Sequence, residues 1–62
     1  MKVTICTNDD VADCGAPYTI PIKSKSARAI SAAMTKAIRA HLKEFPESKA
    51  KNVTAEATDY ED

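Results

Sequence analysis

The first residues alternate between apolar and polar types, a pattern that predicts a strand over residues 2 to 7. Val3 and Ile5 fall on one face of that strand, and the residues between them fall on the other. A period of two built from β-branched residues is typical of a strand with one buried face. The polar run Asn8-Asp9-Asp10 is expected to end the strand, and residues 11 to 17 are expected to form a loop.

Two further alternating segments predict a second and a third strand. In residues 18 to 23 the apolar residues again occupy every second position. Pro21 places this strand at an edge of the sheet, because proline cannot donate a hydrogen bond to a ladder. In residues 52 to 58 the small residues Ala55 and Ala57 share a face with Val53. Small side chains on that face would let a helix lie close to the sheet.

An alanine-rich segment from Ser26 to Phe45 predicts one long helix. Ser24 or Ser26 is expected to cap its first turn, and Pro46 disfavours helical geometry in the residue before it. Six alanines between residues 27 and 40 add intrinsic helicity. At about 100° per residue, the apolar side is expected to contain Ala27, Ile30, Met34, Ala37, Ile38, His41, Leu42 and Phe45, with Arg28, Ala32, Lys36, Arg39 and Lys43 opposite.

The order strand, strand, helix, strand predicts a two-layer α+β fold with ββαβ topology. With residues 18 to 23 at an edge, the first strand takes the centre of a three-stranded antiparallel sheet of order 2-1-3, which packs on the long amphipathic helix. The 62 residues are expected to form a single domain over residues 1–62, in which residues 59 to 62 are a frayed acidic tail.

The short length of the chain limits its hydrophobic core. In domains below about 70 residues one core rarely contributes more than about 3–5 kcal/mol, and many such domains add disulfides, a metal or an oligomer interface. A homodimer is therefore an open alternative. The N-terminal residues lack the apolar run of a signal peptide, so we expect a cytoplasmic protein with no membrane segment. In that reducing compartment Cys6 and Cys14 are expected to be thiols.

The formal net charge is zero, but the charges are segregated into three blocks of alternating sign. Residues 1 to 22 have a net charge of −2, residues 23 to 51 of +6 and residues 52 to 62 of −4. Segregation of this kind predicts interaction surfaces. The alternative is that the basic helix and the acidic terminus neutralise each other within the molecule.

Residue types that support catalysis are scarce in this chain. Nucleophilic or metal-assisted chemistry needs several polar groups that converge on one pocket, and His41 is the only histidine. C-x-x-C and H-x-x-x-H pairs are absent, so we expect no enzymatic activity, no cofactor and no metal site. His41 falls on the apolar side of the helix, where it is expected to bond backbone or water, with a pH-sensing or interface role as the alternative. The acidic run after Thr7 lacks the alternate-position ligands of a calcium loop and is expected to be a solvated turn.

Two charged surfaces are the candidate binding sites. The basic side of the helix, extended by Lys23, Lys25, Lys49 and Lys51, suits an acidic protein surface or phosphates. The acidic C-terminal segment suits a basic surface that normally holds phosphates, although solvent-facing helices and tails also collect such charges. The candidate partner-binding residues are Arg28, Lys36, Arg39 and Lys43 on the basic surface and Glu56, Asp59, Glu61 and Asp62 on the acidic one.

The segment Ile38-Arg39-Ala40-His41-Leu42-Lys43-Glu44-Phe45-Pro46-Glu47, followed by a strand with Val53, resembles part of the DNA-damage-inducible protein I family, which modulates recombinase filaments. The shared features are a helix, a Phe-Pro-acidic turn and a strand. The apolar positions before Phe45 differ in register, and the acidic C-terminal helix of that family is missing, so no functional residue is carried across. In size and character the chain also resembles the small inhibitors that bacteriophages and mobile elements encode against host defence systems, including anti-CRISPR proteins.

Together these observations predict a small non-enzymatic protein that binds a larger protein or protein complex and inhibits or regulates it. The alternative is a nucleic-acid-binding regulator that uses the basic helix face. With one phenylalanine, two tyrosines and no glycine-flanked aromatic motif, the chain has few means of stacking on bases, so nucleic acid ranks after protein as a partner. A third hypothesis, an enzyme using Cys6 or Cys14, would need a thiol more reactive than a free cysteine.

Overall fold

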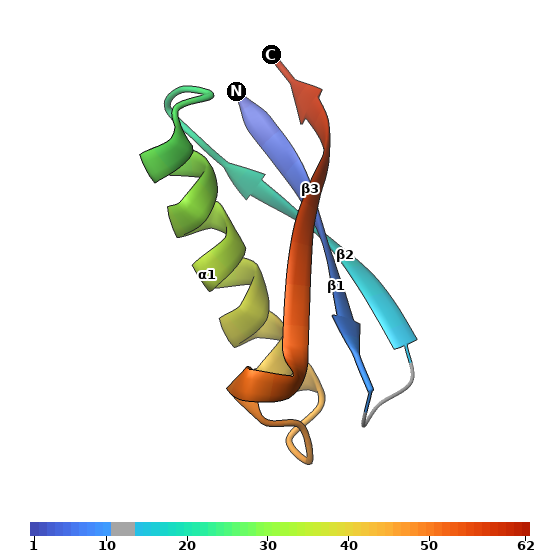
Figure 1. The fold of residues 1–62 in the computed structure, drawn as a ribbon. Helices are drawn as coiled ribbons and strands as arrows, with labels where there is room; N and C mark the ends of the chain where they lie inside the picture. Colours follow the sequence, from blue (N-terminus) through green and yellow to red (C-terminus); the bar gives the residue numbers. More distant parts are fainter. Residues whose placement is uncertain (11–13) are drawn as a thin grey trace.

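A three-stranded antiparallel sheet with one long helix on one of its faces makes up the protein (Figure 1). The computed structural model describes the backbone of residues 1–10 and 14–62 and the side chains of residues 1–10 and 17–62. The sheet order is β2-β1-β3, so the predicted two-layer α+β fold and the central position of the first strand are confirmed. The elements are β1 (Lys2–Asp9), β2 (Cys14–Pro21), α1 (Ala27–Glu44), the short 3-10 helix η1 (Ala50–Asn52) and β3 (Val53–Glu61).

The ends of α1 follow from local signals, as predicted. The Ser26 hydroxyl accepts a hydrogen bond from the Ala29 backbone N–H at 3.2 Å, which satisfies one of the exposed donors of the first turn. At the other end, the Phe45 N–H donates to the His41 carbonyl at 2.8 Å, and Pro46 follows directly. Both termini of the chain lie near the end of the molecule where α1 begins (Figure 1).

The apolar core lies between β1 and the middle of α1. Val3 and Ile5 of β1 and Ala33 and Ala37 of α1 are fully buried against one another. The small alanines allow the helix backbone to approach the sheet closely. The residues predicted for the apolar side of the helix do not include the buried Ala33, and Ala27, which they do include, is exposed. The buried side of α1 is therefore rotated relative to the prediction, because its centre runs through Ala33, Ala37 and His41.

The first two strands are longer than predicted. β1 continues through Asp9, and β2 begins at Cys14, inside the segment expected to be a loop. The proline positions explain why the ladder continues, because Pro17 and Pro21 lie opposite Cys6 and Lys2. The Ile22 N–H donates to the Met1 carbonyl at 2.9 Å, and antiparallel pairs alternate between bonded and non-bonded classes. Both prolines consequently occupy non-bonded pairs, where a missing N–H costs no ladder bond. β2 is an edge strand, as predicted from Pro21.

The third strand also extends beyond its predicted end. We expected residues 59 to 62 to be a frayed tail, but β3 runs to Glu61, which lies opposite Lys2. A shift in the β1–β3 register leaves Thr58 as a β-bulge, after which pairing resumes with Asp59 opposite Thr4. The Lys25 amino group lies 5.3 Å from the centre of the Tyr60 ring and holds this end of β3 near the start of α1.

A buried polar network joins β1 to α1. The Nε2 atom of His41 lies 2.9 Å from Asp9 Oδ2, and its Nδ1 atom lies 2.7 Å from the Thr7 hydroxyl. All three residues are at most 2% exposed. A carboxylate only accepts hydrogen bonds, so the His41 hydrogen toward Asp9 sits on Nε2. We expected Asp9 to be solvated and His41 to bond backbone or water. Both expectations are wrong, because the two side chains are hydrogen-bonded to each other.

We predict that Asp9→Ala destabilises the protein by about 1–3 kcal/mol, because it leaves the buried Nε2 group of His41 without its hydrogen-bond acceptor. A loss of this size is a large fraction of the whole stability expected for so small a core. Urea unfolding followed by circular dichroism measures the effect. Asp10→Ala, at an exposed neighbouring carboxylate, is the control and should change stability by about 0.5 kcal/mol or less. An Asp9→Ala protein as stable as the control would contradict a stabilising role for the network.

Candidate functional site

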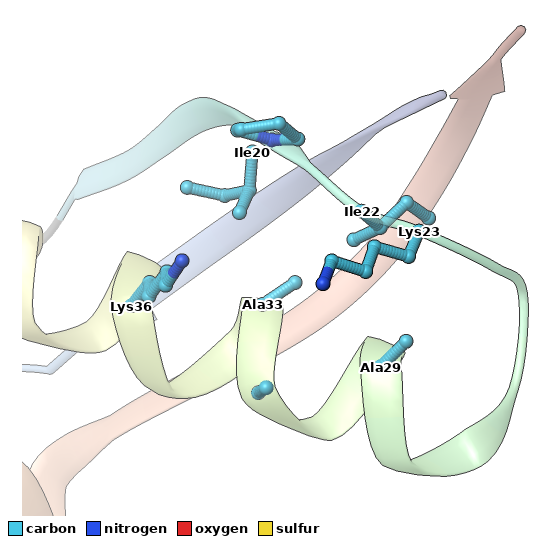
Figure 2. Close-up of a pocket in the computed structure, with 8 residues that line it drawn as sticks. Ile20, Ile22, Lys23, Ala29, Ala33 and Lys36 are labelled. Atoms are coloured by element: carbon cyan, nitrogen blue, oxygen red, sulfur yellow. The ribbon is translucent and has the colours of Figure 1, made fainter.

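A groove between the end of β2 and the first half of α1 is the candidate functional site (Figure 2). Its volume is about 240 Å³. Its walls come from two elements that are adjacent in the chain, the β2 end with the residues that follow it and one side of the helix. The lining residues are Ile20, Pro21, Ile22, Lys23, Ala29, Ala32, Ala33 and Lys36.

The groove forms because large apolar side chains on the strand side face small ones on the helix side. Ile20 and Ile22 are half-buried and pack on the edge of the core. On α1, the residues opposite them are alanines, whose methyl groups leave the space between strand and helix partly unfilled. The hydrogen bond from the Ile22 N–H to the Met1 carbonyl holds the strand side of the groove in place beyond the end of β2.

Two lysines stand at the mouth of this apolar groove. Lys23 comes from the segment after β2 and Lys36 from the helix, and Figure 2 shows both amino groups directed into the space between the two walls. Both side chains are exposed, and among the described residues neither forms an ion pair. Positive charge beside an apolar surface favours a group that combines a carboxylate with an apolar portion, because each part then finds its own complement.

The predicted basic residues of α1 are continuous with this groove. Arg28, Lys36, Arg39 and Lys43 are all exposed. At 3.6 residues per turn, Lys36 and Lys43 lie on the flank toward β2, while Arg28 and Arg39 lie along the outermost line of the helix. The structure therefore groups Lys36 with Lys23, which sequence analysis treated only as an extension of the basic surface. No helix in residues 1–10 and 14–62 is both long and apolar enough to cross a membrane.

The predicted acidic residues lie on a different side of the molecule. Glu56, Asp59 and Glu61 pair with Cys6, Thr4 and Lys2 of β1. These β1 residues alternate with Val3, Ile5 and Thr7, which are buried toward α1, so the carboxylates are on the sheet face that the helix does not cover. Asp62 follows β3 and is exposed.

The two charged surfaces are thus separated by the sheet. Among the described residues, no ion pair joins a basic residue of α1 to a carboxylate of β3. The alternative in which the two surfaces neutralise each other within the molecule finds no support in this arrangement. Each charged surface is left available to a partner of opposite charge.

The buried Thr7–His41–Asp9 network contains the hydroxyl, imidazole and carboxylate of a nucleophilic triad, but its environment is not that of a catalytic site. A triad hydroxyl must reach a substrate carbonyl, whereas Thr7 is 1% exposed and His41 is 0% exposed. The network therefore fixes α1 on β1. Within the described part of the chain, no group of three His, Cys, Asp or Glu residues is arranged to hold a metal ion. Cys6 is a free thiol, and the side chain of Cys14 lies outside the described residues.

The sequence contained a signal for the groove that the search for charged residues missed. Ala29, Ala32, Ala33 and Lys36 are spaced as i, i+3, i+4 and i+7, which puts them on one side of a helix. A row of alanines next to a lysine predicts a shallow apolar surface with a charged rim. What it does not predict is which strand lies opposite.

Comparison with protein-family models, curated proteins and solved structures finds no match to this chain.

We predict that hexanoate binds in the groove, with its alkyl chain on the isoleucines and alanines and its carboxylate between the lysines. Hexylammonium, with the same alkyl chain and the opposite charge, should bind more weakly. Chemical-shift changes at the methyl groups of Ile20, Ile22, Ala29 and Ala33 measure this by NMR. Changing Lys23 and Lys36 together to glutamine should weaken hexanoate binding by about threefold or more, since exposed ion pairs contribute about 0.2–1 kcal/mol each.

The control is the double variant Lys49→Gln and Lys51→Gln, which removes the same charge from residues near η1 that do not line the groove. Hexanoate binding should be retained in this control. Equal binding of hexanoate and hexylammonium, or shifts spread over the whole molecule, would contradict an anion-selective groove.

Proposed function

We propose that this protein is a small protein-binding module that inhibits or regulates a larger protein by docking α1 and the adjacent groove on an acidic surface of that partner. The observation that carries the proposal is the pair of lysines, Lys23 and Lys36, at the mouth of an apolar groove. The groove supplies a place for one apolar side chain of the partner. The basic residues around it complement carboxylates that flank that side chain.

The energetics of protein interfaces favour this arrangement. Fully burying one large apolar side chain contributes about 1.5–3 kcal/mol, and binding energy is concentrated where such an anchor fills a pocket. Charges around the rim contribute less to affinity, but they steer the encounter and exclude partners of the wrong sign. A chain with a very small core of its own can still inhibit or regulate by docking, because the larger partner provides the anchoring side chain and the acidic surface.

Within this proposal, the protein acts in the cytoplasm without catalysis, cofactor or metal. A small module that occupies a functional surface of a larger complex is the mode of action of the inhibitors that phages and mobile elements use against host defence systems. We place the protein in that functional class on its size, its charged surfaces and its groove.

A second candidate function is nucleic-acid binding through α1. The observation that favours it is the exposed basic row of Arg28, Lys36, Arg39 and Lys43 along one helix. Binding of this kind weakens steeply with salt, because each phosphate contact releases condensed counterions. It would also be insensitive to filling the apolar groove, which separates it from the first proposal.

We predict that a pull-down from bacterial lysate with the tagged protein yields a stoichiometric protein partner that resists nuclease treatment. Reversing the groove charges with Lys23→Glu and Lys36→Glu should abolish its recovery, because the carboxylates of the partner would be repelled. Ala32→Trp, which fills the groove without changing charge, should also reduce recovery. A quadruple variant in which Arg28, Lys36, Arg39 and Lys43 are all changed to glutamate tests whether the wider basic surface of α1 also contributes to partner binding.

The matched control is Lys49→Glu with Lys51→Glu, which makes the same charge change outside the groove and should leave recovery intact. Circular dichroism must be unchanged in every variant. A partner recovered equally by all variants would refute docking through α1 and the groove. Recovery of nucleic acid and its associated proteins alone, lost after nuclease, would instead support the second candidate function.

A further inference from the structure

The two edges of the sheet differ in their capacity to accept another strand. β2 forms one edge and β3 the other. On the β2 edge, Pro17 and Pro21 occupy the non-bonded pairs with β1, so their nitrogen atoms face outward, where an added strand would need donors. Two of the outward positions on this edge therefore have no N–H to offer. The β2 edge is closed to regular strand addition.

The β3 edge has no such block. β3 contains neither proline nor glycine over its nine residues. The Met1–Ile22 bond sets the alternation across the sheet, so the backbone groups of Thr54 and Glu56 point to β1 and those of Ala55 and Ala57 point away from it. Apart from the Val53 N–H, which bonds the Ala50 carbonyl, no backbone bond to this outer edge occurs among the described residues. An edge of unpaired N–H and C=O groups is a template for another strand.

The side chains beside this edge define the sequence pattern of a strand that could bind there. On the helix side lie Ala55 and Ala57, with Met34 and Ile38 on the flank of α1 opposite the groove. On the open face lie Glu56 and, beyond the bulge, Asp59. An added strand that alternates apolar and basic residues would place its apolar side chains against the helix flank and its basic ones beside the carboxylates.

We propose that the β3 edge, at Ala55 and Ala57, binds an extended segment of another protein with alternating apolar and lysine or arginine residues by strand addition. A second copy of the chain fits this edge less well, since β3 carries three carboxylates and no basic residue. Pairing two such edges would bring like charges together. The carboxylates thus discourage self-pairing and select a basic strand. The bulge at Thr58 sets the far limit of the regular edge.

This inference is independent of the proposed function. The groove lies between β2 and α1, whereas the β3 edge lies on the other side of the sheet. Loss of binding at one site leaves the other intact, so the two proposals can fail separately. If both hold, the protein has an acidic-surface site and a basic-strand site on opposite sides.

The test uses the full chain and a synthetic seven-residue peptide of alternating valine and lysine, with an alternating valine and glutamate peptide as its charge control. In the free protein, amide hydrogen exchange should be fast at Ala55 and Ala57 and slow at Thr54 and Glu56. Saturation with the lysine peptide should slow exchange at Ala55 and Ala57 by about tenfold or more, whereas the glutamate peptide should have no effect. Protection by both peptides would overturn the charge selection, and protection by neither would overturn strand addition.

Substitutions at the edge test the same contact without depending on exchange rates. Ala55→Pro removes an outward N–H without breaking a bond to β1 and should weaken lysine-peptide binding by about tenfold, while Ala55→Val, which keeps the N–H, should not. If Ala55→Pro does not fold, Glu56→Lys with Asp59→Lys tests the charge contribution and should abolish binding of the lysine peptide. Unchanged binding in that double variant would overturn the proposal, as would dimerisation of the parent protein through this edge in preference to the peptide.

Discussion

The hydrogen-bonded contact of His41 with Asp9 and Thr7 determines how the helix sits on the sheet. The apolar core is small, and its contribution from α1 consists of the methyl groups of Ala33 and Ala37, whose contacts specify the rotation of the helix less sharply than a hydrogen bond does. A buried imidazole with one partner on each nitrogen has only one satisfactory position. Because His41 is held over β1, the helix presents its alanine and lysine flank to β2 and its Met34 flank to β3. The groove follows from that orientation, because alanines on α1 then face Ile20 and Ile22.

Local signals in the sequence were sufficient to predict the long helix, the three strands and their arrangement, but not η1. The Ser26 cap, the alanine-rich segment and Pro46 determine where the helix begins and ends, and periodicity identifies three strands. The predicted strand ends were wrong where the conformation of a polar residue depends on a partner that is distant in the sequence. Asp9 ends a strand by local criteria, yet it continues one here because its carboxylate accepts a hydrogen bond from His41. The C-terminal residues resemble a frayed tail until the bulge at Thr58 restores their pairing with β1.

The prolines show that residue type alone does not predict where a strand ends, because the direction in which the backbone nitrogen points also matters. Pro21 correctly indicates an edge strand, whereas Pro17 falls in the segment that turn-forming residue types predicted to be a loop, although β2 contains it. Whether a proline breaks a strand depends on the direction in which its nitrogen points, and that direction alternates along the strand. Pro17 and Pro21 are four positions apart, an even spacing, so both nitrogens face outward once either does. The candidate binding residues show a similar limit, because composition identified the charges but not the apolar groove beside Lys36.

The same residues that let so small a domain fold also create the groove and the charged edge of the sheet. Alanines in α1 raise helix propensity and allow close packing on the sheet, but on the β2 side they leave a groove that the isoleucines do not fill. Three strands are enough to cover one side of a single helix, and in so narrow a sheet two of the three strands are edge strands. One edge is closed by proline and the other carries carboxylates. Features that a larger domain would bury thus remain on the surface, with apolar and charged parts adjacent, as the proposed contacts with a partner require.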